Sequence, residues 1–203
     1  MGLREWAVKP VELKALTRSG LFLFSARCAL RAEPWLPAIA AAIWADALRF
    51  LVGAAFGDHV DAAEIMRRQT ALSDCGARAC NGLARADEPR GRCISYATST
   101  LAMAVRSTGL DARPALVKET ILVAKLAASI GATWAHAGRV KVGGGKDAVD
   151  LVCTRTWSEI RRDIPLVAAH TPAVEASKDR VRALRELAPL WARGEPAWAA
   201  PPL

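Results

Sequence analysis

Several features are missing from this chain of 203 residues, and the absences bear on its secondary structure, its number of domains and its targeting. No segment shows the strict alternation of apolar and polar residues that marks a half-buried β-strand, so no sheet is expected. No long linker divides the chain, which favours one large domain over two small ones. The opening residues, MGLREWAVKPVELK, have no apolar stretch directly after their charges, so they do not predict a secretory signal.

Recognisable catalytic signatures are missing as well. The histidines His59, His136 and His170 do not follow H-E-x-x-H spacing, and no G-x-S-x-G nucleophile motif occurs. The glycine run before Lys146 lacks the earlier glycine of a phosphate-binding loop, and Asp147 stands where that loop needs Ser or Thr. We therefore assign no catalytic residue, expect no cofactor and lean towards a non-enzymatic role. A helical enzyme whose site is assembled from residues far apart in sequence stays as an alternative.

Cysteine usage bears on the compartment and on metal binding. The five cysteines are an odd number and do not form the dense framework of a small disulfide-rich domain, so reduced thiols and a cytoplasmic protein are predicted. Cys75, Cys80 and Cys93 could offer three thiolates to a metal, with His59 or His136 as a fourth ligand. A five-residue step, however, turns two helical side chains about 140° apart. Buried thiols without a metal are therefore the preferred interpretation.

Arginine dominates the charge of the chain. With 28 Lys and Arg residues against 20 Asp and Glu, the formal net charge is +8 and the pI is about 9.7, which raises encounter rates with acidic partners. Most of the arginines are scattered, as on an ordinary solvated surface. The strongest local cluster predicts nucleic-acid contacts as an alternative function, through Arg67, Arg68, Arg78, Arg85, Arg90 and Arg92. Neither a helix-turn-helix nor interleaved aromatic residues accompany this cluster.

What the sequence does contain is helical periodicity. Residues 111–138 are expected to form one long helix, because two adjacent apolar stripes recur along them at spacings of three and four residues. The narrow polar seam of this helix consists of Lys118, Lys125, Ser129 and Thr133. A helix with so little polar surface must be surrounded by others. The predicted fold class is all-α: a single bundle of about seven or eight helices over residues 1–190, followed by a Pro- and Trp-rich tail over 191–203.

The most apolar run, residues 36–56, has about the length of a membrane span. Asp46 and Arg49 lie near its middle, and each would cost about 2.5–3.5 kcal/mol to insert. Their spacing of three residues lets them pair on one face of a helix, which lowers that cost. A core helix of a soluble protein is the preferred interpretation, and membrane association through 36–56 is an alternative.

Glycine and proline define the remaining boundaries. Gly20 is expected to break a helix over 11–19, and Pro165 is expected to end a helix over 148–164. In the helix expected over 21–33, Arg27 and Arg31 lie opposite the apolar side. The other helices are expected at 62–85, 93–107 and 172–187, with a loop over 86–92.

Tryptophan is frequent, with seven residues, whereas there is one tyrosine. Trp44, Trp134 and Trp157 fall on apolar helix faces and are expected in the core. Trp6 and Trp198 lie near the ends of the chain, and Trp191 continues the apolar stripe of the last helix. Because exposed tryptophan is a favoured anchor at protein interfaces, these three are the candidate partner-binding residues. The alternative is that these terminal side chains fold back onto the domain, and Trp191 is expected to pack against the bundle.

Two patches carry a resemblance to a known kind of module. ARCALRAEPWL, residues 26–36, resembles the early helix of Ala-rich, all-helical modules in uncharacterised bacterial proteins. TWSEIRRDIPLV, residues 156–167, followed by APLWARGEPAWA, residues 188–199, resembles the closing pattern of the same modules. Such modules are similar to accessory parts of bacterial conflict systems and supply no catalytic residues. The resemblance therefore implies a bacterial, helical, protein-binding role.

These observations lead to three hypotheses about function. The first is a non-enzymatic, cytoplasmic helical bundle that binds another protein or a second copy of itself. The second is a nucleic-acid-associated basic protein that uses the arginine cluster. The third is a membrane-associated subunit anchored by residues 36–56.

Overall fold

The computed structural model describes residues 7–81, 83, 87–137, 146–192, 194–196 and 198–199. Within these residues the chain forms α-helices and short 3-10 helices and no strand, which confirms the all-α prediction. The 3-10 helices are η1 (Glu12–Ala15), η2 (Glu33–Trp35) and η3 (Ala38–Ala40). The α-helices are α1 (Arg18–Ala32), α2 (Ala41–Ala55), α3 (Ala62–Asn81), α4 (Glu88–Ser107), α5 (Arg113–His136), α6 (Lys146–Ala176) and α7 (Arg180–Glu186).

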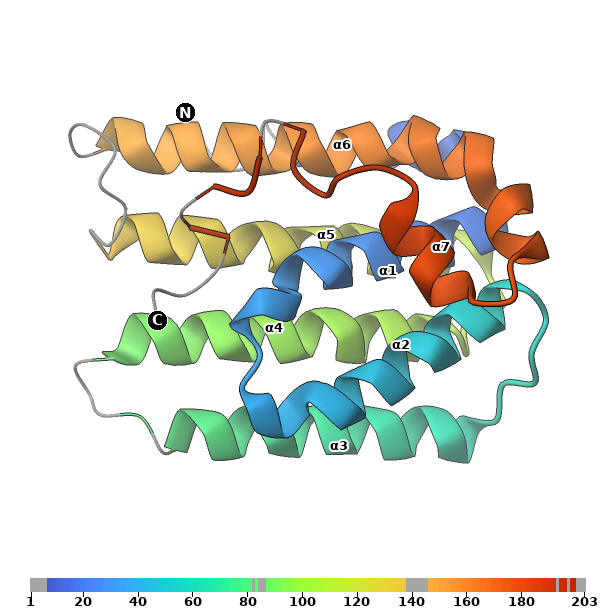
Figure 1. Ribbon diagram of the computed structural model, residues 1–203, viewed down its shortest axis with the longest axis horizontal. Coiled ribbons are helices and arrows are strands. Elements are labelled where there is room, and N and C mark those ends of the chain that lie inside the picture. The colour runs from blue at the N-terminus through green and yellow to red at the C-terminus, as the bar shows by residue number, and fades with distance from the viewer. Residues whose placement is uncertain are drawn as a thin grey trace.

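Four long helices form a row of antiparallel neighbours in the order α3, α4, α5, α6 (Figure 1). Helices α1 and α2 cross one face of this row, and the short α7 lies beside α1 and α2 at one end. The arrangement is the one that amphipathic helices adopt when each buries an apolar stripe against its neighbours.

Helix α5 matches the long helix that the sequence predicts for residues 111–138. Its first predicted stripe is buried along its whole length, at Leu116, Thr120, Val123, Ala127, Ile130 and Trp134. The second stripe is covered less completely, because Val117 and Ile121 are only half-buried. Lys118 and Lys125 of the polar seam are exposed. One side of α5 therefore remains open, at the boundary between the second stripe and the lysines.

Helix α1, rather than α5, is the most completely enclosed element. Every residue from Gly20 to Ala32 is buried. Gly20 does not break a helix as predicted but lies in the first turn of α1, where Thr17 Oγ1 accepts a hydrogen bond from its backbone N–H at 3.1 Å. Arg27 and Arg31, which the sequence places opposite the apolar side, are buried together with it.

Three expected boundaries around proline are also wrong. Pro165 and Pro172 both lie inside α6, which runs from Lys146 to Ala176 without a break. Each proline removes one helical hydrogen bond, but Ile164 and Val174, which flank the two prolines, are buried in the core, and this tertiary packing keeps the helix continuous. Helix α4 begins at Glu88, inside the predicted loop, because Pro89 in its first turn has no need of an N–H partner.

The apolar run 36–56 becomes η3 and α2. Among the described residues, 38–55 form the one helical segment that is long and apolar enough to span a membrane, and 44% of it is buried within the fold. A core helix of a soluble protein meets the same criteria. Asp46 does not pair with Arg49 as the spacing suggests; it pairs with Arg68 of α3, at 3.0 Å.

The chain turns back onto the bundle after α7. Trp191, Trp198 and Ala199 are all buried. The Trp198 indole lies against Gly131 of α5, where a Cβ would stand only 3.0 Å from Cδ1 of the ring. The guanidinium of Arg155 lies over the same ring, 5.3 Å from its centroid. The described part of the Pro- and Trp-rich segment is therefore packed as part of the domain.

Candidate functional site

The most conspicuous polar cluster in the interior joins α1 to α6. Arg27, Arg31 and Asp163 are almost completely inaccessible to solvent. Arg27 Nη2 donates to one carboxylate oxygen of Asp163 at 3.0 Å, and Arg31 Nη1 donates to the other. One carboxylate thus holds two buried guanidinium groups.

Other Nη donors of this cluster reach backbone carbonyls in the C-terminal segment, and Arg31 Nη2 also donates to Glu159 O of α6 at 3.0 Å. Arg27 Nη1 donates to Leu184 O at 3.0 Å and to Ala188 O at 3.2 Å, and Arg31 Nη2 donates to Leu190 O at 2.9 Å. These carbonyls lie at and beyond the end of α7, where helical partners are lacking. The cluster is therefore a structural clamp that fastens residues 184–190 to α1 and α6.

Burial keeps four of the five cysteines in the protonated thiol form. Burial raises the pKa of Cys28 and of Cys93 to about 12, and it also raises the pKa of Cys80 and Cys153. A thiol must ionise to act as a nucleophile or a metal ligand, and these thiols stay protonated at neutral pH. All five cysteines are free, and no group of three or more His, Cys, Asp or Glu side chains in the described part of the chain could hold a metal ion.

The predicted nucleic-acid contacts that the structure describes lie on the neighbouring helices α3 and α4. Arg67 and Arg68 pair with Glu64, and Arg92 pairs with Glu88 at 2.6 Å. Arg78 and Arg90 are exposed, and Arg85 lies outside the described residues. Along α3, Arg67 and Arg78 are separated by about 16 Å. Much of the predicted cluster is thus neutralised locally and spread along two helices.

The candidate partner-binding tryptophans are covered by the chain itself. Trp191 is 9% exposed and Trp198 is 7% exposed, and Trp6 lies outside the described residues. The Arg31 guanidinium carbon lies over the Trp191 ring, 5.8 Å from its centroid, so the indole packs against the buried arginine cluster. A partner would have to displace the C-terminal segment to reach either of these indoles.

The open side of α5 offers a different surface, which we call the lysine groove. It is a hollow of about 530 Å³ between η1 and α5, lined by Pro10, Lys14, Arg113, Pro114, Val117, Lys118, Glu119, Ile121, Leu122 and Lys125. Its floor is apolar, because Val117 and Ile121 are only half-buried and Leu122 is 38% exposed. Contiguous apolar patches on a protein surface often mark interaction sites.

Most of the charges around this floor are positive. Arg113 donates to Leu16 O at 2.6 Å and to Lys14 O at 3.2 Å, which fixes η1 against the start of α5. Glu119, the one acidic residue of the lining, pairs with Arg106 outside the groove. The ammonium groups of Lys14, Lys118 and Lys125 make no hydrogen bond or ion pair within the described chain, in contrast to the guanidinium groups of most of its arginines. Three ammonium groups are thus free to meet a ligand.

The groove does not end at Lys125. That residue also borders a second hollow of about 250 Å³, which is lined by Ala128, Ala132 and Trp157 among others. The two hollows together follow α5 from Pro114 to Ala132, a length of about 27 Å at the rise of an α-helix.

The sequence contains part of the signal for this site. It identifies Lys118 and Lys125 as an exposed seam beside the second apolar stripe, seven residues apart and thus on one face. It gives no indication that Lys14 would join them, because only the fold brings η1 against α5.

Comparison of the chain with protein-family models, with curated proteins and with solved structures finds no match. The function of the lysine groove has to be argued from the chemistry of its own residues. An apolar floor with a cationic rim is complementary to an amphipathic segment whose polar side is acidic.

Proposed function

We propose that this chain is a non-enzymatic protein-binding module, and that the lysine groove receives an acidic amphipathic helix of a partner protein. The observation that carries this proposal is the combination of half-exposed Val117, Ile121 and Leu122 with three lysines that have no acidic partner in the described chain. Reduced, buried thiols support a cytoplasmic location for the module.

The shape of the surface favours a helix as the occupant. Helices dock into grooves by placing apolar residues at i, i+3, i+4 and i+7 against the floor. The two hollows span about 27 Å along α5, which corresponds to about 18 residues of a partner helix. The buried area would fall at or below that of a standard interface, so we expect an affinity in the micromolar range.

Electrostatics favour an acidic partner over a second copy of this chain. In a symmetric dimer built on the groove, Lys14, Lys118 and Lys125 of one protomer would face the same cationic rim in the other. Like charges in an interface are repulsive. Glutamate or aspartate flanking an apolar stripe would instead meet all three ammonium groups.

Peptide selection would test this proposal without knowledge of the natural partner. A display library of random peptides of about 18 residues would be selected on the wild-type chain and depleted on the Lys118→Glu/Lys125→Glu variant. We expect enriched peptides to carry a helical apolar stripe and a net negative charge. Enrichment of neutral or basic peptides, or no enrichment over the variant, would contradict the proposal.

A control variant separates the groove from the general charge of the protein. Arg78→Glu changes the net charge by the same amount per site, at an exposed arginine of α3 that does not line the groove. Selected peptides should bind this variant as they bind the wild type. Equal loss of binding in Arg78→Glu would show that non-specific charge attraction is responsible.

A further inference from the structure

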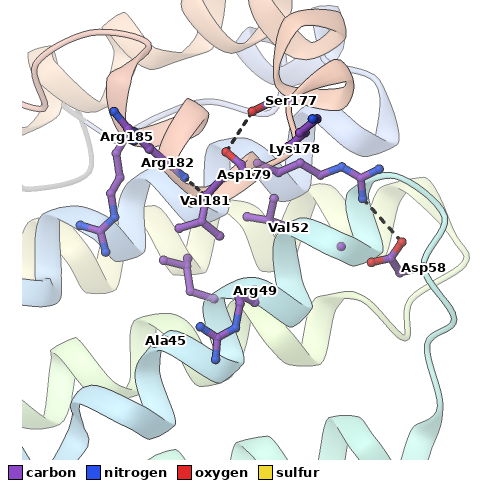
Figure 2. Close-up of a pocket in the computed structure, with 13 residues that line it drawn as sticks. Ala45, Arg49, Val52, Asp58, Ser177, Lys178, Asp179, Val181, Arg182 and Arg185 are labelled. Carbon is purple, nitrogen blue, oxygen red and sulfur yellow. Dashed lines mark hydrogen bonds and ion pairs between the residues drawn. The ribbon is translucent and has the colours of Figure 1, made fainter.

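A further cavity, which we call the basic pocket, lies between α2 and the turn that joins α6 to α7 (Figure 2). Its volume is about 790 Å³, within the range of about 300–1,000 Å³ that small-molecule sites occupy. Five cationic residues line it, namely Arg49, Lys178, Arg180, Arg182 and Arg185. The acidic residues of the lining are Asp58 and Asp179.

Three of these cations are held by carboxylates. Arg185 forms a two-pronged contact with Glu33, at 2.6 and 2.7 Å, and Arg182 contacts Glu186 at 2.8 Å. Arg180 lies 3.6 Å from Asp58. A guanidinium carries five N–H donors in a fixed plane, so a carboxylate that occupies two of them leaves others available. These pairs orient the arginines without using all of their donors.

The other two cations have no carboxylate partner in the described chain. Arg49 projects from α2, and its expected partner Asp46 is already committed to Arg68 at 3.0 Å. Lys178 lies in the turn before α7, where Asp179 instead accepts the backbone N–H of Arg182 at 2.9 Å. Two exposed cations from separate elements thus line the same cavity, and each lacks a counter-charge.

The positions of these groups indicate a ligand with more than one anionic group. In Figure 2 the guanidinium groups of Arg49 and Arg185 lie on one side of the pocket. Lys178 lies towards the other end, where Arg180 meets Asp58. Between them the wall is apolar, formed by Leu48, Val52 and Val181 among others. A single phosphate would reach the cations at one end only, whereas a ligand with several phosphates could contact cations at both ends.

We infer that the basic pocket binds a small molecule that carries two or more phosphate groups. Phosphate suits this site because its oxygens accept two-pronged contacts from guanidinium groups and its charge can satisfy several cations at once. The apolar wall would cover the organic part of the ligand. The inference does not depend on the lysine groove, since the two sites share no lining residue.

Calorimetric titration at low salt would test it, with ATP, inorganic tripolyphosphate and inorganic orthophosphate as the probes. We expect saturable binding of ATP and tripolyphosphate and much weaker binding of orthophosphate. Arg49→Ala and Lys178→Ala should each weaken ATP binding by about 10-fold or more, the size expected for losing a hydrogen bond to a charged group. Both side chains are exposed, so the variants should keep the melting temperature of the wild type.

The control is Arg78→Ala, which removes an exposed arginine from α3 outside the pocket and should leave ATP binding unchanged. Absence of saturable binding of both ATP and tripolyphosphate would overturn the inference, as would equal weakening in the control. An oligonucleotide that binds more tightly than ATP and loses its affinity in Arg49→Ala would also overturn it, in favour of a nucleic-acid site. If Arg49→Ala loses ATP binding but still binds the peptides selected on the lysine groove, the two binding sites are independent of each other.

Discussion

Replacement of Asp163 by asparagine should cause a large loss of stability, because this carboxylate compensates two buried guanidinium groups. Arg27 Nη2 lies 3.0 Å from one of its oxygens, and Arg31 donates to the other. Asp163 and Arg27 are 0% exposed. Removing one partner from a buried ion pair costs about 3–5 kcal/mol, because a charge remains buried without compensation. That is a large part of the about 5–15 kcal/mol that stabilises a typical domain.

Urea unfolding of Asp163→Asn, followed by circular dichroism at fixed pH, would measure this loss. Hydrogen exchange gives a local reading, and we expect residues 184–190 to lose protection first because their carbonyls are held by the two arginines. The matched control is Glu88→Gln, which breaks the exposed Glu88–Arg92 pair and should cost less than about 1 kcal/mol. A loss below about 1 kcal/mol for Asp163→Asn would refute the clamp described here.

Two further predictions concern the core. Gly131→Leu should destabilise the domain by about 1–3 kcal/mol and displace the Trp198 indole, because even a Cβ at position 131 would stand 3.0 Å from that ring. Thermal unfolding would measure the loss of stability, and tryptophan fluorescence would report the displacement of the indole. An unchanged melting temperature would contradict the packing of Trp198 against Gly131. Alkaline pH should destabilise the fold through Cys28 and Cys93. Their pKa rises from 9.0 to about 12 on folding, so the unfolded thiols ionise first and the free energy of unfolding should fall between pH 9 and pH 12. The double variant Cys28→Ala/Cys93→Ala should flatten this dependence, and an equally steep fall in that variant would show that other groups are responsible.

The helices could be predicted from the sequence where local periodicity determines them. In α5, apolar residues recur every three or four positions in the sequence, and the structure buries this stripe as predicted. The enclosure of α1 could not be predicted, because the partner of Arg27 is Asp163, 136 residues away. An arginine on the less apolar side of a helix indicates solvent unless the fold supplies a buried carboxylate.

Local sequence rules also fail for the prolines of α6 and for the partners of several charged residues. Pro165 predicts a helix end from local rules, yet the packing of α6 along its length outweighs one missing hydrogen bond. Lys118 and Lys125 were visible as a seam, but Lys14 joins them only because η1 lies against α5. Arg49 was expected to pair with Asp46, and it is left free because α3 presents Arg68 to that carboxylate instead. Sites built from several elements depend on tertiary contacts that local patterns do not specify.

A charge-swap titration tests the central claim, that the lysine groove binds an acidic amphipathic helix, most directly. An amphipathic peptide of about 18 residues with glutamate beside its apolar stripe would be titrated into the wild type and into Lys118→Glu/Lys125→Glu. Its lysine-substituted counterpart would be titrated into both as well. We predict that the glutamate peptide binds only the wild type and that the lysine peptide binds only the variant. Equal affinity of the glutamate peptide for both proteins, or binding of neither peptide to either protein, would contradict the account.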